Sequence, residues 1–87
     1  MWAILLIGGM VNYAASRDTC YFELWSNSWK MAPELNQARF YNSSCMLGNF
    51  AYTFAGNGRN NTFINSIEKL DFKSMIDGDT DAVWNLI

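Results

Sequence analysis

The chain has 87 residues, enough for one small domain, and carries a formal net charge of −2 with six basic residues. A hydrophobic fraction of 51%, with 16% aromatic residues, excludes a disordered chain, because disorder requires low hydrophobicity and high net charge. The basic residues are scattered, so nothing favours binding of nucleic acid, and the absence of histidine removes the commonest general base and metal ligand.

The first predicted element, residues 2–7, is a continuous apolar run of strand length, typical of a strand that is covered on both faces. The apolar stretch 1–11 and the small residues that follow it also resemble a secretory signal peptide, although no positive charge precedes the stretch and two glycines interrupt it. The stretch is too short for a membrane span. We therefore expect no membrane contact, and a cytoplasmic location with secretion as the alternative.

The remaining predicted strands are short, rich in aromatic or β-branched residues, and separated by clusters of Gly, Asn, Asp and Ser. Pro33 marks a connection over residues 32–36, because proline donates no ladder hydrogen bond. Gly48 and Asn49 predict a tight hairpin, since both tolerate positive φ. The fold class is therefore all-β, with further strands over 19–24, 28–31, 40–46, 50–55, 63–72 and 82–87.

Two parts of the chain repeat each other at nearly constant spacing. Gly56 follows Gly9 by 47 positions, and Leu70 follows Leu24 by 46. A period of about 40–50 residues with strand content is typical of the blades of a β-propeller. The repeat therefore predicts a piece of a repetitive interaction surface.

The order of the repeated residues resembles the kelch repeat. In that family each repeat forms one four-stranded antiparallel blade of a β-propeller, with a di-glycine that ends the second strand and a tryptophan in the fourth. The resemblance implies a partial blade of three strands over residues 1–36 and a full blade over 37–87, about one and three-quarter blades in all. It rests on Gly8, Gly9 and Trp29 in the first repeat and on Arg39, Gly56, Glu68 and Trp84 in the second.

Departures from the kelch pattern also carry information. Ala55 stands where the first glycine of the second repeat is expected, and residues 73–81 lengthen that repeat. The number of blades is small for a closed propeller, and each repeat needs stacked neighbours to bury its apolar faces. We therefore expect further blades, in cis or in trans. Trp29 and Trp84 are expected to fill the space between neighbouring sheets.

The resemblance implies a protein–protein interaction module that binds a partner through loops on one rim. In an up-and-down blade, the loop 57–62 and the connection 30–38 emerge at the same rim. Arg39 is expected near the mouth of the central channel, where its guanidinium can form a bidentate ion pair with a carboxylate of the partner. The alternative for this residue is a structural guanidinium bonded to loop carbonyls. Arg59 and Asn57 are the other expected partner-binding residues.

No motif predicts catalysis, a cofactor or a metal ion, and we expect the chain not to be an enzyme. The carboxylates of residues 77–81 invite a calcium interpretation, but they fit an EF-hand loop poorly, and an exposed turn is the simpler interpretation. Cys20 and Cys45 show no zinc-type spacing, and the sequence leaves their redox state open. In the secreted alternative, Asn42 or Asn60 would carry a glycan, since both fit the acceptor pattern.

Overall fold

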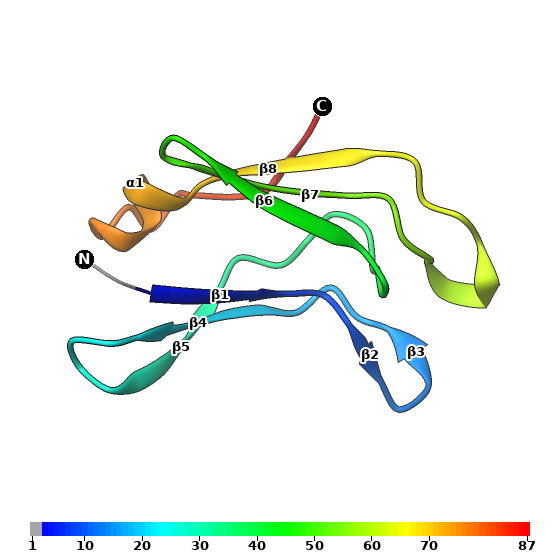
Figure 1. Ribbon diagram of the computed structural model, residues 1–87, viewed down its shortest axis with the longest axis horizontal. Helices are drawn as coiled ribbons and strands as arrows, with labels where there is room; N and C mark the ends of the chain where they lie inside the picture. Colours follow the sequence, from blue (N-terminus) through cyan, green and yellow to red (C-terminus); the bar gives the residue numbers. More distant parts are fainter. Residues whose placement is uncertain (1–2) are drawn as a thin grey trace.

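The computed structural model of the chain describes residues 3–87 as an all-β protein made of antiparallel sheets in two layers (Figure 1). Trp2, the first residue of the first expected strand, lies outside the described residues. The first sheet has the strand order β1-β4-β5, with β1 at Ala3–Ile7, β4 at Thr19–Glu23 and β5 at Ser28–Ala32. The second sheet has the order β6-β7-β8-β9, with β6 at Ser43–Leu47, β7 at Phe50–Phe54, β8 at Ile67–Asp71 and β9 at Asn85–Leu86.

The tight hairpin expected at Gly48 is confirmed. Leu47 pairs with Phe50 across a two-residue turn, in which Gly48 takes a φ of 62°. A Cβ at that φ would be strained, so glycine fits the position. The turn therefore sets the register of β6 and β7, which pair over five residues.

Two predicted strands in the second half are shorter than expected. The strand expected over 63–72 is confirmed only for Ile67–Asp71. A short helix, α1 (Phe72–Ile76), follows directly and is capped by the Asp71 side chain, which accepts a hydrogen bond from Ser74 N at 3.0 Å. The strand expected over 82–87 is reduced to Asn85–Leu86. The prediction was wrong at these boundaries. The capped helical turn replaces the last residue of the strand expected over 63–72, and at the start of that strand Phe63 forms only an isolated bridge with Asn57.

The strand expected over 40–46 begins later than predicted, at Ser43. Phe40 instead exchanges both backbone hydrogen bonds with Asn57, at 2.9 and 2.8 Å, in an isolated bridge. The chain then turns at Tyr41, whose φ is +56°. A residue at positive φ interrupts an extended strand, which explains the late start of β6.

A further hairpin lies between β1 and β4 and was not predicted. Its strands are β2 (Met10–Val11) and β3 (Ala14–Ala15), and Asn12 and Tyr13 form the turn with φ values of 53° and 65°. Two successive residues at positive φ are typical of the turn that matches the twist of a hairpin. The hairpin projects from one end of the first sheet (Figure 1).

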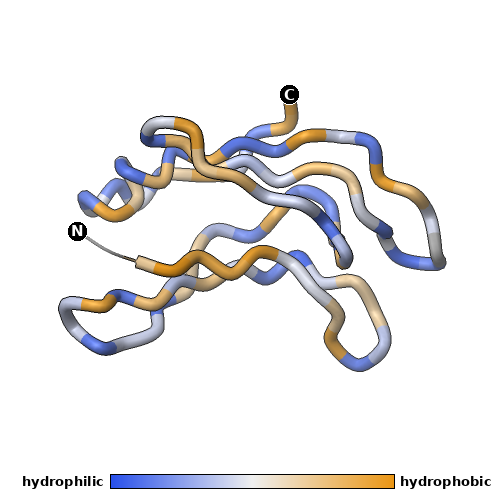
Figure 2. Tube along the Cα trace, viewed as in Figure 1, coloured by the Kyte–Doolittle hydropathy of each residue, from blue (hydrophilic) through white to orange (hydrophobic). Residues whose placement is uncertain are grey.

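The two sheets stack face to face, and the core lies between them. The second sheet contributes Ala51 and the fully buried Leu70, and Trp84 lies just before β9 with 3% of its surface exposed. Leu5 from β1 packs against this cluster, and Leu35, from the connection between the sheets, is buried in it. Figure 2 shows the apolar run of β1 beside the second sheet. The stacking therefore removes apolar surface of both sheets from water.

The other face of the first sheet is open, so Trp29 does not fill the space between the two sheets. Trp29 is 58% exposed and packs on its cross-strand partner Phe22, with ring centroids 5.1 Å apart. Side chains alternate between the faces of a sheet, and cross-strand partners share a face. This outer face of the first sheet carries Ile4, Leu6, Cys20, Phe22, Trp29 and Met31.

Two glycines allow close approach of the segment that enters the second sheet. A Cβ on Gly8 would lie 2.7 Å from the carbonyl oxygen of Arg39, and a Cβ on Gly56 would lie 2.7 Å from that of Phe40. Both glycines also have positive φ, 68° and 91°. Any other residue at these positions would have to displace backbone.

Ala55 has a φ of +59°, a value that suits glycine better than alanine. We expect Ala55→Gly to raise the free energy of unfolding by about 0.5–1 kcal/mol, because the relief of left-handed strain exceeds the entropy that glycine adds to the unfolded chain. The midpoint of urea denaturation measures the change. The matched control is Ala51→Gly, at a buried strand position, which we expect to destabilise. A lower midpoint for Ala55→Gly would contradict the assignment of strain.

Candidate functional site

Three loop segments meet at one end of the molecule, which we call the loop end. They are residues 8–18 with the β2–β3 hairpin, residues 33–42 between the sheets, and residues 55–66 between β7 and β8 (Figure 1). Backbone hydrogen bonds join them, among them Arg39 N to Ser16 O at 3.1 Å. The first two segments are also joined by the bond from Leu35 N to Arg17 O at 2.9 Å. The loop end is therefore a continuous surface whose segments are joined by backbone hydrogen bonds.

Arg59 lies at the centre of the loop end. It is exposed and borders three neighbouring hollows, of about 360, 340 and 270 Å³. Its guanidinium makes no hydrogen bond or ion pair with any residue in the range 3–87 that the structure describes. We call this region the Arg59 surface; it is lined by Tyr13, Ala14, Arg17, Glu34, Gln37 and Arg59.

Exposed aromatic rings accompany Arg59 at the loop end. Tyr13, at the tip of the β2–β3 hairpin, is 98% exposed, and Phe63 and Tyr41 are also exposed. Aromatic residues and arginine are enriched at protein–protein interfaces, because rigid rings supply large contact areas at low entropic cost. This composition favours a partner protein over a small polar ligand.

Asn57 has a mainly structural place in this surface. Its backbone N–H and C=O both bond to Phe40, at 2.8 and 2.9 Å, and its side chain is only half-buried. A second bridge links Asn57 to Phe63. The residue therefore anchors the loop that presents Arg59, and a direct contact of its side chain with a partner stays a prediction.

Arg39 lies inside the fold and offers nothing to a partner in this structure. Its side chain is 0% exposed, and the guanidinium donates to Ala55 O at 3.2 Å, to Ser66 O at 2.9 Å and to the carboxylate of Glu68 at 3.0 Å. The expected partner contact by Arg39 is therefore corrected to a structural role. Bonds to loop carbonyls were the alternative for this residue, but its pairing with Glu68 was not anticipated.

Glu68 is also 0% exposed, and it gathers donors from the connection between the sheets. Asn36 N donates to its carboxylate at 2.6 Å, Asn36 Nδ2 at 3.0 Å and Gln37 N at 3.1 Å, beside the two bonds from Arg39. Burial by itself raises the pKa of Glu68, but the N–H of Asn36, the Arg39 guanidinium and the other donors outweigh burial and lower the pKa. The carboxylate is thus charged at neutral pH.

The lowered pKa of Glu68 makes stability depend on pH. Because the folded pKa lies below the unfolded value, the stabilisation is complete above about pH 5 and is lost as pH falls through the folded pKa. We expect urea midpoints to fall steadily below pH 5. Glu68→Gln should remove the part of this pH dependence that the Glu68 carboxylate contributes. An identical pH slope for both proteins would contradict the prediction.

Carboxylates of the acidic run 77–81 bind to residues close to them in the sequence. The Asp79 carboxylate accepts hydrogen bonds from Asp81 N and Ser74 Oγ, both at 2.9 Å, which lower its pKa, and Lys73 pairs with Asp77. Within residues 3–87, no three His, Cys, Asp or Glu side chains come together as metal ligands would. In the same part of the chain, no helix has the length and apolar character needed to cross a membrane.

The structure also shows the surroundings of the residues on which the secreted alternative depends: the two possible glycan acceptors, the two cysteines and the apolar stretch near the N-terminus. Asn42 is half-buried and its amide donates to Thr53 Oγ1 at 2.7 Å, so a glycan there would break a packed contact, whereas Asn60 is exposed. Cys20 and Cys45 are free thiols. The apolar stretch near the N-terminus forms β1, which pairs with β4 over five residues.

The fold and the loop end together define an all-β protein in which two stacked antiparallel sheets present an arginine-centred surface with exposed aromatic rings. Comparison with protein-family models and with curated proteins found no match. The resemblance to the kelch repeat therefore rests on the residues alone.

Proposed function

We propose that the chain is part of a kelch-type β-propeller, about one and three-quarter blades, that binds a partner protein through loops on one rim. The Arg59 surface carries this proposal. It combines an exposed guanidinium that has no bond to the described residues with an adjacent, fully exposed tyrosine. A location in the cytoplasm belongs to the same proposal.

Repetition of the sheets supports the propeller part of the proposal. Strands β1, β4 and β5 pair in the same order as β7, β8 and β9, and positive-φ residues follow both β1 and β7. The face of the first sheet that carries Trp29 corresponds, by register, to the face of the second sheet next to Trp84. The sheets therefore stack front to back, as successive blades of a propeller do.

The outer face of the first sheet supports further blades, in cis or in trans. Trp29 and Met31 are exposed on it, beside other apolar side chains. Exposed contiguous apolar surface of this kind marks an interaction site. In the proposed propeller, a preceding blade covers this face as the first sheet covers Trp84.

We expect Arg59→Ala to weaken partner binding by at least about tenfold, the effect of removing an interfacial arginine. A photo-crosslinking residue in place of Tyr13 identifies the partner, and titration with that partner measures the affinity. The matched control is Lys73→Ala, an exposed cation on α1 at the opposite end of the molecule (Figure 1). Equal affinity of Arg59→Ala and the unaltered chain would exclude the Arg59 surface as the binding site.

The alternative of a small secreted glycoprotein makes a different prediction. Cleavage after the apolar stretch would remove β1 and with it Leu5, which packs on the core. Mass analysis of the mature chain distinguishes the two, because the proposed function requires β1 to be retained.

A further inference from the structure

Two arginines border the same hollow of the Arg59 surface, the one of about 340 Å³, which we call the two-arginine hollow. Arg17 follows the β2–β3 hairpin, Arg59 lies between β7 and β8, and both are exposed. None of the residues that line this hollow is acidic; Asp18 and Glu34 line the neighbouring hollow of about 270 Å³, which the arginines also border. Among the described side chains, no ion pair joins these carboxylates to either arginine.

The guanidinium of Arg17 is fixed in place while its outer nitrogens stay available. Its Nε donates a hydrogen bond to Leu35 O at 2.7 Å, and Leu35 N donates to Arg17 O at 2.9 Å. The two Nη groups bond to no residue that the structure describes. A guanidinium that is already fixed loses less conformational entropy when it binds an anion.

A third polar group in the two-arginine hollow is the side-chain amide of Gln37. Arg39 donates to Ser66 Oγ at 2.8 Å, and the Ser66 hydroxyl in turn donates to Gln37 Oε1. Because a hydroxyl has one proton, this chain of bonds holds the amide oxygen toward Ser66 and leaves Nε2 as a donor. Within the described part of the chain, Nε2 has no acceptor.

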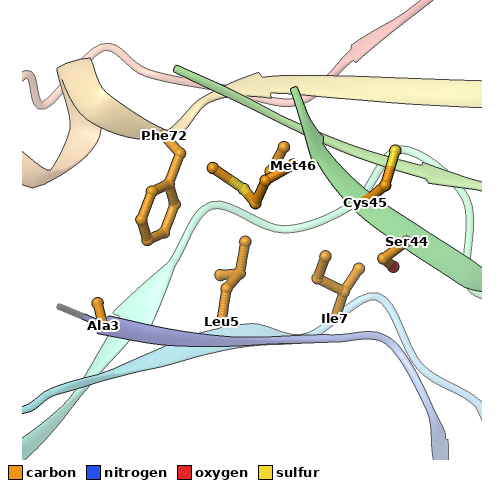
Figure 3. Close-up of a pocket in the computed structure, with 8 residues that line it drawn as sticks. Ala3, Leu5, Ile7, Ser44, Cys45, Met46 and Phe72 are labelled. Atoms are coloured by element: carbon orange, nitrogen blue, oxygen red, sulfur yellow. The ribbon is translucent and has the colours of Figure 1, made fainter. Parts of the chain in front are cut away.

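The cavity between the two sheets offers a contrast. It measures about 420 Å³ and is lined by uncharged residues, with Leu5 and Ile7 facing Met46 and Phe72 (Figure 3). An anion would lose its hydration there without gaining a charged partner. Anion binding is therefore expected in the two-arginine hollow and not between the sheets.

We propose that the two-arginine hollow binds a phosphate group on a phosphorylated side chain of the partner protein, an inference that rests on the proposed function. A phosphorylated side chain carries about −1.5 to −2 charges at neutral pH and three acceptor oxygens. Two guanidinium groups match that charge, and Arg17, Gln37 and Arg59 supply donors from three separate loop segments. A carboxylate has one charge and two oxygens, which a single guanidinium satisfies, so the hollow fits phosphate better.

Nuclear magnetic resonance of the arginine Nε–H groups tests the inference on the 87-residue chain without the partner. The probe is the capped tripeptide Ala-phosphoserine-Ala at neutral pH and constant ionic strength. We expect the signals of Arg17 and Arg59 to shift and saturate, whereas Arg39, buried with Glu68, stays unmoved and reports an intact fold. The amide of Leu5, at the cavity between the sheets, should also stay unmoved. The same tripeptide with glutamate in place of phosphoserine should bind at least about tenfold more weakly.

Three variants locate the site. Arg17→Gln and Arg59→Gln each remove one charge and should weaken binding of the phosphopeptide at least about tenfold. Gln37→Glu keeps an acceptor for Ser66 but replaces the Nε2 donor by an acceptor, and it should weaken binding as much. The matched control, Lys73→Ala, should leave the affinity unchanged. Equal weakening by Lys73→Ala, or equal affinity for the glutamate peptide, would overturn the inference.

Phosphatase treatment of the partner separates this inference from the proposed function. The partner is the protein that is crosslinked through position 13, and removal of its phosphate should weaken its binding at least about tenfold. Unchanged affinity of the dephosphorylated partner would overturn the inference about phosphate. The Arg59→Ala titration decides independently whether the Arg59 surface binds the partner at all.

Discussion

Replacing Glu68 by alanine is expected to lower the free energy of unfolding by about 3–5 kcal/mol. The substitution leaves the guanidinium of Arg39 buried with no counter-charge, and it removes the acceptor for the N–H groups of Asn36 and Gln37. Those two residues lie in the connection that joins the sheets, so both the stacking and the loop end depend on one carboxylate. Urea denaturation followed by far-UV circular dichroism measures the loss.

Two controls separate burial of the charge from the loss of a side chain. The double variant Arg39→Met with Glu68→Leu removes both charges and should recover much of the stability, although Asn36 N and Gln37 N stay without their acceptor. Asp77→Ala breaks the exposed pair with Lys73 and should cause no measurable change. A double variant as unstable as Glu68→Ala would show that the bonds to the connection, and not the buried ion pair, dominate.

The strands of the first sheet could be predicted from the sequence because their signals are local. Residues 3–7 form an uninterrupted apolar run, and the expected strands over 19–24 and 28–31 match β4 and β5 to within one residue at each end. The turn at Gly48 is also local, since its φ decides which residue fits. These elements follow from propensity, alternation and turn chemistry.

Elements that depend on less typical turn residues were missed. The β2–β3 hairpin turns at Asn12 and Tyr13. Such a turn usually has asparagine followed by glycine, and a tyrosine at positive φ is uncommon, so only Asn12 indicated the turn in the sequence. The end of β8 had a signal that was not used: Asp71 stands three residues before Ser74, the spacing of a helix cap. Strand propensity over residues 63–72 obscured it.

The interior of the candidate site could not be predicted, because it depends on which residues the fold brings together. Arg39 and Glu68 both matched the repeat pattern, but their pairing spans 29 positions, and only the packed sheets bring them together. Trp29 and Trp84 likewise occupy matching positions in sequence, whereas only Trp84 has a sheet stacked on it. Pattern assigns a residue to a face; tertiary contacts decide whether that face is covered.

The buried ion pair and the Arg59 surface are physically connected. Glu68 fixes Asn36 and Gln37 through their backbone N–H groups, and these two residues line a hollow that Arg59 also borders. The side chain of Gln37 is further bonded to Ser66, which accepts from Arg39. A residue that holds the connection in place thus positions the surface at which we expect a partner to bind.

Trp84→Ala is expected to lower the free energy of unfolding by about 3–5 kcal/mol, because it leaves a large cavity in the cluster between the sheets. Trp29→Ala, at a position 58% exposed, should cost less than about 1 kcal/mol in the same chain. The indole Nε1 of Trp84 is buried without a hydrogen-bond partner among the described residues, so Trp84→Phe removes an unsatisfied donor and should cost less than the alanine variant. Equal losses for Trp84→Ala and Trp29→Ala in urea denaturation would show that the outer face of the first sheet is covered in solution.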